Sequence, residues 1–285
     1  MTVVAAGLIL FTLMLAVGLE LTTDDFRRVA RYPRAVWVGT LGNILALPIA
    51  TVLLLRPLDV SPNLAAGLVL ITATPGAAMS NVFTYLAGAH TALSVTLTAI
   101  ASLLAVVTLP IIMALGVRGL GGSVPAFDVP VVALGGQLLL LVLLPTVLGM
   151  LLRRRWPVAT ARHAGKLRAG TLACVVAVIA LSVGADESGL LGEVWSGLPL
   201  AFGWTVMAML LGIALSAAAG LGSDDRLTVG IELAAKNVGL SAIVALTALE
   251  SAELAVFAGA YVMVGYPFIL VTALVRKRLH AGATA

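Results

Sequence analysis

Residues 227–250 read LTVGIELAAKNVGLSAIVALTALE, and they combine the hydropathy of a membrane span with three polar residues near its middle. These residues are Glu232, Lys236 and Asn237, and Gly230 and Gly239 bracket them. A charge at that depth costs roughly 2.5–3.5 kcal/mol on insertion scales, so it is retained where it meets a partner or a water-filled cavity. The stretch therefore predicts an interrupted helix whose freed backbone groups line a site in mid-membrane.

The composition is that of an integral membrane protein. Of 285 residues, 61% are hydrophobic and 11% are charged, whereas an ordinary soluble domain is about 25% charged. Apolar runs near the ~20 residues that a helix needs to cross a bilayer favour helices over a barrel. The basic residues are concentrated in a few loops, so they indicate orientation in the lipid bilayer rather than nucleic-acid binding.

The apolar runs predict nine transmembrane helices, the first of which is read as a span because no basic region precedes it. Arginine and lysine follow spans 1, 5 and 9, which the positive-inside rule places in the cytoplasm of a cell-membrane protein. We therefore expect the N-terminus outside and the C-terminus inside. Aromatic residues including Trp204 and Tyr266 are expected near the membrane interfaces. The predicted spans are residues 3–19, 35–55, 63–87, 92–116, 129–152, 169–184, 198–220, 227–249 and 254–275.

A second interrupted span is predicted in the first half of the chain. Residues 63–87 contain TATPGAAMSN, in which Pro75 removes a backbone donor and Gly76 loosens the helix. Pairing spans 1–4 with spans 6–9 puts the two breaks, in spans 3 and 8, at matching positions. The two broken spans then cross the membrane in opposite directions. This pattern predicts an inverted-topology repeat with span 5 unpaired, and paired breaks point to the binding site of a secondary transporter.

Several oxygen-bearing side chains gather around the first break. Thr72 and Thr74 precede it, and Ser80 and Asn81 follow it. Ser94 and Thr98 in span 4 are four residues apart, so they share a helical face. With the Glu232 carboxylate, these hard oxygens suit a small cation such as Na⁺. The alternative for Ser94 or Thr98 taken singly is a hydrogen bond between neighbouring helices.

Glu232 and Lys236 are four residues apart, in the order that favours an ion pair if the helix continues there. One interpretation is an internal pair that lowers the insertion cost. The other is that the Lys236 ammonium takes the place of a bound cation and that the pair exchanges protons as the conformation changes. Asn43 in span 2 is expected to hydrogen-bond a neighbouring helix, whereas Asn237 at the break is placed for a substrate carboxylate.

Three segments of the chain resemble the bile acid:sodium symporter family. They are GLELTTDDFRRVARYPRAV at 18–36, ATPGAAMSNVFTYLAGAHTALSVTLTAIASL at 73–103 and GIELAAKNVGLSAIVAL at 230–246. The resemblance implies a core domain with two crossing broken helices and a smaller panel domain, which work by alternating access. Residues 35–116 and 186–285 would form the core, and residues 1–34 and 117–185 would supply the panel helices.

The resemblance also implies ligand sets, with Na⁺ as the metal. The second cation site is altered, because family members that bind two sodium ions usually have glutamine at positions 43 and 236. A fixed ammonium there would repel Na⁺, so we expect coupling to one Na⁺ or to a proton. The first sodium site falls on Ser80, Asn81, Ser94, Thr98 and Glu232; the altered site on Asn43, Glu232 and Lys236; and the substrate site on Gly76, Ala77, Ala78, Asn237, Val238 and Gly239.

The predicted function is secondary transport of a small organic anion, such as pantoate, a 2-oxo acid or a bile-acid-like compound. A nucleotide-binding GxxxxGK[ST] loop is absent from the sequence, and so are HExxH and GxSxG motifs, so neither ATP-driven transport nor hydrolase activity is expected. Alternatives are a proton-coupled or uncoupled carrier of the same fold, an arsenite or auxin-type efflux protein, and a membrane sensor or scaffold that has lost transport.

Overall fold

The structure, a computed structural model, describes residues 3–121, 129–160, 162–167, 169–170, 173 and 190–283. Within these residues the chain is helical, and its extended segments form one isolated bridge rather than a strand. Five helices are long and apolar enough to cross a membrane, or up to six if a pair bent by 67° near the N-terminus counts as one span. The chain is thus a multi-pass membrane protein, while the total of nine spans and the inverted repeat stay predictions.

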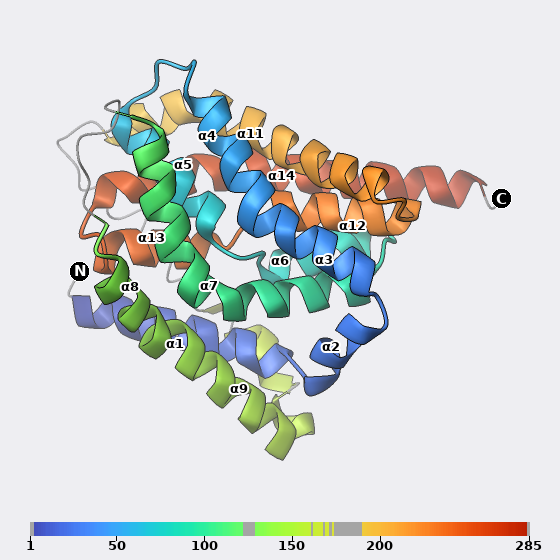
Figure 1. Cartoon of the computed structure of the whole chain (residues 1–285). Helices are drawn as coiled ribbons and strands as arrows, with labels where there is room; N and C mark the ends of the chain where they lie inside the picture. The colour runs from blue at the N-terminus through green and yellow to red at the C-terminus, as the bar shows by residue number, and fades with distance from the viewer. Residues whose placement is uncertain are drawn as a thin grey trace.

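Figure 1 shows the order of the described helices along the chain. Their bounds are α1 Val3–Glu20, α2 Thr23–Arg27, η1 Arg28–Ala30, α3 Pro33–Leu41, η2 Gly42–Ala46, α4 Leu47–Leu55, α5 Pro62–Ala73, α6 Ala78–Leu86, α7 Thr91–Gly119, α8 Val131–Leu138, η3 Leu139–Leu143, α9 Leu144–Arg155, α11 Leu190–Ala218, α12 Ser223–Ala234, α13 Val238–Thr247 and α14 Ala252–Ala283. Most of the sixth predicted span, residues 169–184, lies outside the described residues.

Both predicted interruptions are present. Helix α5 ends before Thr74 and α6 begins at Ala78, and α12 ends at Ala234 before α13 begins at Val238. The two extended segments pair with each other through an isolated bridge between Gly76 and Lys236. Backbone bonds flank this bridge, from Ala77 N to Ala235 O at 3.2 Å and from Asn237 N to Pro75 O at 3.0 Å. At each break, backbone groups that lack a partner in their own helix therefore bond to the backbone of the other break.

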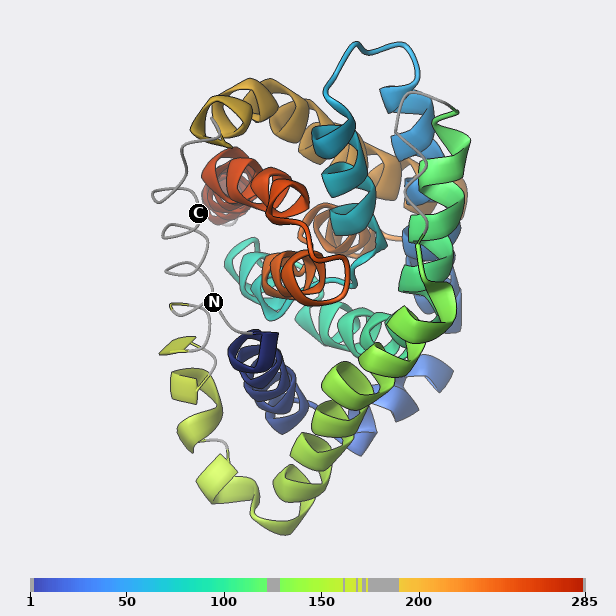
Figure 2. The ribbon, with the colours of Figure 1, turned by 90° about the vertical axis from the view of Figure 1, so that its left-hand side faces the viewer.

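Helices α1 and α9 pack together along one side of the molecule (Figures 1 and 2). The contact is close because two glycines meet there. A Cβ atom on Gly18 would overlap the carbonyl oxygen of Thr146, and one on Gly149 would lie 2.7 Å from the Leu19 nitrogen. Small residues allow such backbone approach between membrane helices, where dispersion rather than the hydrophobic effect drives association. Helix α1 also packs against α13.

Two helices contain a turn of π-helix shortly before a proline. The turns are η2 at Gly42–Ala46 and η3 at Leu139–Leu143, and Pro48 and Pro145 follow them. A proline supplies no N–H and its ring crowds the preceding turn, so the wider turn relieves both conflicts. In η2 this wider turn contains Asn43, which is buried.

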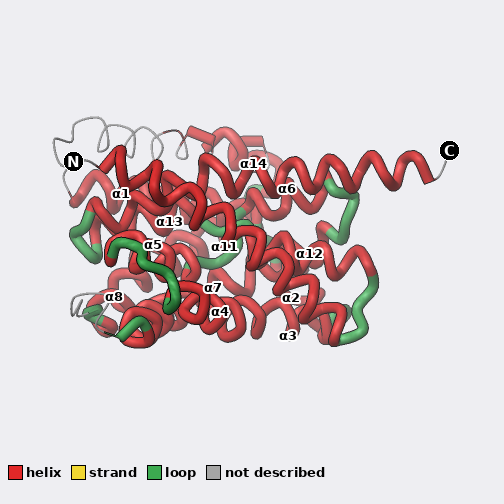
Figure 3. Tube along the Cα trace, turned by 90° about the horizontal axis from the view of Figure 1, so that it is seen from above, coloured by secondary structure: helices red, strands yellow, loops and turns green. Residues whose placement is uncertain are grey.

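Two sequence expectations differ from the structure. The last helix continues to Ala283, beyond the predicted end at 275, and its end projects past the other helices (Figure 3). The predicted end was the end of the apolar run. The helix continues beyond it because arginine, lysine and leucine are good helix formers. Trp204, which was expected near a membrane interface, is fully buried within the protein, and its ring nitrogen donates a hydrogen bond to Thr51 Oγ1 at 2.9 Å.

Candidate functional site

Three helices bring together the five residues that were predicted for the first sodium site. Helix α6 supplies Ser80 and Asn81, α7 supplies Ser94 and Thr98, and α12 supplies Glu232. Thr98 Oγ1 lies 2.8 Å from one oxygen of the Glu232 carboxylate, and Ser94 Oγ lies 3.1 Å from the other. Ser94 Oγ is also 2.8 Å from Asn81 Oδ1, and Ser80 Oγ is 3.2 Å from Thr98 Oγ1. We call these five residues the Glu232 cluster.

With Glu232 ionised, the Glu232 cluster has more oxygen acceptors than hydroxyl protons to satisfy them. Ser94 is within hydrogen-bond distance of both Asn81 Oδ1 and Glu232 Oε2, but its hydroxyl carries a single proton. The Ser80 hydroxyl is 2.6 Å from the Ala77 carbonyl, to which it donates. Since Glu232 is only 1% exposed, bulk water does not make up the difference. An acceptor-rich buried site of this kind is suited to a small cation.

Gly76 allows the Glu232 carboxylate to reach the first break. A Cβ atom at Gly76 would overlap Glu232 Oε1 and would lie 2.7 Å from the carboxyl carbon. Any other residue would therefore displace the carboxylate from the Glu232 cluster. The proline-glycine pair at 75–76 thus has two effects, because it interrupts the helix and it leaves room for an acid from the other half of the chain.

Lys236 lies on the other side of the crossing and does not pair with Glu232. Its side chain is fully buried, and its ammonium donates hydrogen bonds to Asn43 Oδ1 and to the Thr74 carbonyl, the latter at 3.0 Å. No ion pair joins Glu232 to Lys236 within the part of the chain that the structure describes. The expected i,i+4 pair is absent because α12 ends at Ala234, which removes the helical register between the two residues.

Two tyrosines of α14 hold the second break, and sequence reasoning missed both roles. The Tyr261 hydroxyl donates to the Ala234 carbonyl at 2.5 Å and accepts from Lys236 N–H at 3.1 Å. The Tyr266 hydroxyl donates to the Lys236 carbonyl at 2.7 Å. These bonds satisfy backbone groups that the break releases. The available signal was a pair of tyrosines inside an apolar helix, but Tyr266 was assigned to the membrane interface.

The residues predicted to bind substrate lie at the beginnings of α6 and α13. Asn237 is 8% exposed, and its side-chain oxygen accepts from Leu240 N at 3.0 Å, so it caps α13. The cap uses the amide oxygen, whereas a substrate carboxylate would accept from N–H groups, among them the amide nitrogen of Asn237. The bridge between the two breaks keeps the two sets adjacent; they are Gly76, Ala77 and Ala78 at the first break and Asn237, Val238 and Gly239 at the second.

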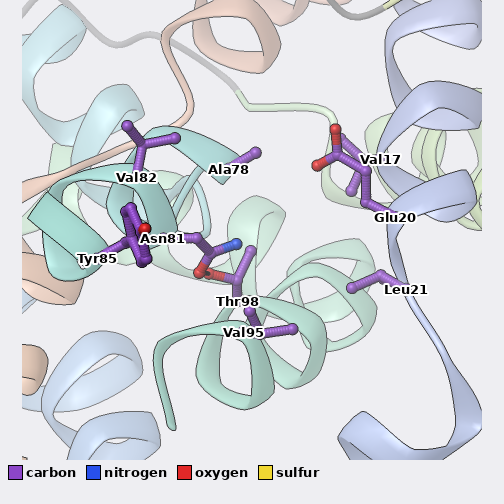
Figure 4. Close-up of a pocket in the computed structure, with 9 residues that line it drawn as sticks. All are labelled: Val17, Glu20, Leu21, Ala78, Asn81, Val82, Tyr85, Val95 and Thr98. Atoms are coloured by element: carbon purple, nitrogen blue, oxygen red, sulfur yellow. Dashed lines mark hydrogen bonds between the residues drawn. The ribbon is translucent and has the colours of Figure 1, made fainter. Parts of the chain in front are cut away.

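A cavity of about 300 Å³ lies between α1 and the helices that carry the Glu232 cluster (Figure 4). Ala78, Asn81 and Thr98 line it from α6 and α7, so the cavity adjoins the cluster. Of the predicted substrate residues, Ala78 is the one among its described lining residues. Sequence reasoning missed the opposite wall, which comprises Val17 and Glu20 of α1 and Leu21, the residue that follows α1. No sequence pattern marks it, because an acid at the end of a span is expected to be solvated.

Comparison with known proteins adds the evolutionary context. The model of the Sodium Bile acid symporter family matches residues 7–190. A Bacillus subtilis protein described as an uncharacterized sodium-dependent transporter, YocS, is 30% identical over 239 residues, which is 82% of this chain and 71% of the Bacillus protein. A probable chloroplastic sodium/metabolite cotransporter of rice, BASS2, is 37% identical over 150 residues, 53% of this chain and 34% of the rice protein.

A third relative is a probable chloroplastic sodium/metabolite cotransporter of Arabidopsis thaliana, BASS1. It is 36% identical over 101 residues, which is 35% of this chain and 25% of the Arabidopsis protein. The chain therefore aligns with about a third or less of the two plant relatives and with most of the bacterial one.

Proposed function

The chain belongs to the sodium bile acid symporter family, and we propose that it is a secondary transporter that couples the movement of a small organic anion to Na⁺. The observation that carries this proposal is the Glu232 cluster, in which one carboxylate, one amide and three hydroxyls converge from three helices. The names of the relatives, which describe sodium-dependent or sodium/metabolite transporters, support the same coupling ion.

The first sodium ion would bind among the oxygens of the Glu232 cluster. Its positive charge would offset the buried carboxylate, and its ligands would be hard oxygens of the kind that Na⁺ prefers. Because α6, α7 and α12 each contribute ligands, binding would fix the two broken helices relative to each other. The ion would then bind one conformation of the transporter more tightly than the other, and a symporter requires such a difference in affinity.

The second cation would be the Lys236 ammonium itself. It already donates to Asn43 Oδ1 and Thr74 O, two oxygens that a metal ion would otherwise use. A permanent cation there would lower the stoichiometry to one Na⁺ per cycle. The alternative is coupling to a proton, which the buried acid and the buried amine on opposite sides of the crossing also support.

Alternating access would move the core domain, residues 35–116 and 186–285, against the panel helices of residues 1–34 and 117–185. The close packing of α1 on α9 supports a panel that moves as one body. In the full proposal the chain has nine spans with inverted repeats, its N-terminus is outside, and its C-terminus is cytoplasmic. A substrate carboxylate would bind near the backbone N–H groups that begin α6 and α13.

A sodium titration of the purified protein tests this function. Thermal unfolding would be followed against NaCl, with choline chloride as the ionic-strength control. A ligand that binds only the folded state stabilises it by about 2.7 kcal/mol at 100 times its Kd, so we expect a saturable rise in Tm that choline does not reproduce. A parent protein that responds equally to both salts would contradict sodium coupling, and uptake driven by a pH gradient would then be measured.

Substitution of two threonines of α7, one inside the Glu232 cluster and one outside it, tests where Na⁺ binds. Thr98→Val removes an oxygen of the Glu232 cluster and should abolish the sodium-specific shift. Thr108→Val is the control, because the Thr108 hydroxyl bonds to the Leu104 carbonyl of its own helix at 3.1 Å. Equal sodium responses of the two variants would move the ion away from the Glu232 cluster.

A further inference from the structure

Helix α12 packs against both α6 and α7 (Figure 1), and hydrogen bonds join these helices at two levels. One level is the Glu232 cluster, where hydroxyls of α7 bond to the carboxylate of α12. The other level lies at the beginnings of α7 and α12, where His90 bonds to Asp225 and Thr228. We call these three residues the His90 clasp. The proposed function uses the first level and leaves the second without a role.

His90 makes both bonds of the His90 clasp, one with its backbone and one with its side chain. Its N–H donates to Thr228 Oγ1 at 3.0 Å, and its ring nitrogen Nδ1 lies 2.7 Å from Asp225 Oδ1. Because a carboxylate only accepts, Nδ1 is the donor of this bond. The imidazole ring also meets Tyr32 edge to face, with 4.6 Å between the ring centroids. The His90 and Asp225 side chains are 24% and 26% exposed, so most of each is shielded from competing water.

The His90 clasp lies on the same helix faces as the Glu232 cluster. His90, Ser94 and Thr98 follow one another at intervals of four residues, and so do Thr228 and Glu232. Residues at this interval are neighbours on one face of a helix. His90 immediately precedes α7, and its carbonyl accepts from the Ser94 N–H at 3.2 Å. The clasp is therefore one helical turn from the cluster on both helices.

The same contact also holds α6. Residues 87–90 join α6 to α7 in a tight turn, in which Gly88 has a φ of 64° and Ala89 N donates to the Thr84 carbonyl at 3.0 Å. Because this connection is short and bonded to the end of α6, a bond at His90 restrains both helices. The three helices that supply the Glu232 cluster are thereby tied together at one end.

We propose that His90, Asp225 and Thr228 are positioning residues that hold α12 against α6 and α7 at the spacing that Na⁺ binding requires. This inference rests on the proposed sodium-coupled transport and adds a determinant of ion affinity outside the ion site. The physical reason is preorganisation, because the ligands of the Glu232 cluster come from three helices. If a smaller fraction of the molecules has these helices together, the apparent Kd for Na⁺ rises in inverse proportion.

The Kd for Na⁺, taken from titration of Tm with NaCl against choline chloride, tests the inference. His90→Ala and Asp225→Ala should each raise this Kd about fivefold. The double variant should raise it by the same factor, because the second substitution removes a bond that is already lost. Asp224→Ala is the matched control on the same turn of α12. Its carboxylate bonds to Arg276 of α14 at 2.6 Å rather than to α7, so the parent Kd should be retained.

Conservative variants separate positioning from a general contribution to stability. His90→Asn places an amide nitrogen where Nδ1 stands, so its Kd should stay within about twofold of the parent. Thr228→Ser keeps the acceptor of the His90 N–H and should also bind Na⁺ as the parent does, whereas Thr228→Val removes it and should weaken binding. Tm measured in choline alone reports stability. A clasp that only stabilises the fold would lower this Tm in the weakened variants and leave the Kd unchanged.

The outcomes distinguish this inference from the proposed function. If the parent shows a sodium-specific rise in Tm and the Kd is unchanged in His90→Ala and Thr228→Val, the clasp has no positioning role and the symporter remains. Equal weakening by Asp224→Ala, or a product of the single effects in the double variant, would also overturn the pairing of His90 with Asp225. If the parent shows no sodium-specific rise, the proposed function fails and this inference fails with it.

Discussion

The two sides of the helix crossing use similar buried polar groups to opposite effect. On one side, the Glu232 cluster gathers oxygen acceptors with too few protons to satisfy them. On the other side, Asn43 and the Thr74 carbonyl already bind the Lys236 ammonium. The first arrangement favours a cation from solution, and the second contains one that is covalently attached. On the proposed function, we expect the residue type at position 236 to set how many ions the crossing requires.

Removing the acid of the first side should have the largest effect. Glu232→Gln keeps the shape of the side chain but removes the negative charge that a cation would offset. We expect sodium affinity to fall about 100-fold or more, equivalent to about 2.7 kcal/mol, and coupled uptake into proteoliposomes to fall to background. Glu250→Gln, at an exposed acid beyond α13, is the control. Sodium-dependent uptake that persists in Glu232→Gln would remove the cluster from the mechanism.

Displacing the acid without removing it should have the next largest effect. In Gly76→Ala the added methyl group would overlap the Glu232 carboxylate, and overpacking of this kind costs about 1–3 kcal/mol. Sodium affinity from the titration of Tm should fall about tenfold.

The control for this change is a glycine with space around it. A Cβ atom at Gly136 of α8 meets no atom within 4 Å, so Gly136→Ala should leave sodium binding unchanged. It should also stabilise the helix by up to about 1 kcal/mol. Equal sodium affinity in the two alanine variants would show that the Gly76 contact does not position the acid.

Replacing the attached cation should make the two sides more alike. Lys236→Gln supplies an amide in place of the ammonium, and we expect the sodium dependence of uptake to become steeper, from that of one bound ion to that of two. Lys236→Met removes the charge without adding an oxygen, so it should not gain the second ion. It should also lose about 1–3 kcal/mol of stability for each acceptor left without a donor. A Lys236→Gln protein whose sodium dependence matches the parent would contradict the role of the ammonium.

The tyrosines of α14 should give the smallest effects. Tyr261→Phe leaves both the Ala234 carbonyl and the Lys236 N–H without this partner, whereas Tyr266→Phe affects the Lys236 carbonyl, which also accepts from Val238 N at 3.1 Å. We expect losses in the free energy of unfolding of about 2 kcal/mol and about 1 kcal/mol, respectively. Denaturant titration would measure both. Tyr85→Phe, at a side chain that is 72% exposed, should be neutral, and the reverse order of the two losses would contradict the bonding described here.

Local sequence was sufficient to predict the helical membrane character and the two breaks, and the resemblance to a known family selected the five members of the Glu232 cluster from the polar residues around the first break. Hydropathy runs encode spans because lipid requires every backbone group to be satisfied within the segment. The proline-glycine pair and the charges at mid-span disturb that pattern where the helices break. Ser94 and Thr98 share a face by helical periodicity alone, so their convergence required no knowledge of the tertiary structure.

Only the tertiary structure decided which partner each buried group would have. The four-residue spacing suggested that Lys236 would bind Glu232, but α12 ends between them, and the ammonium instead meets Asn43, 193 residues away in the sequence. The tyrosine contacts to the second break and the Glu20 wall of the cavity likewise come from helices that are distant in the sequence. Local periodicity fixes which residues share a face, whereas the packing of distant helices fixes what each face meets, and that packing depends on contacts that no short stretch of sequence contains.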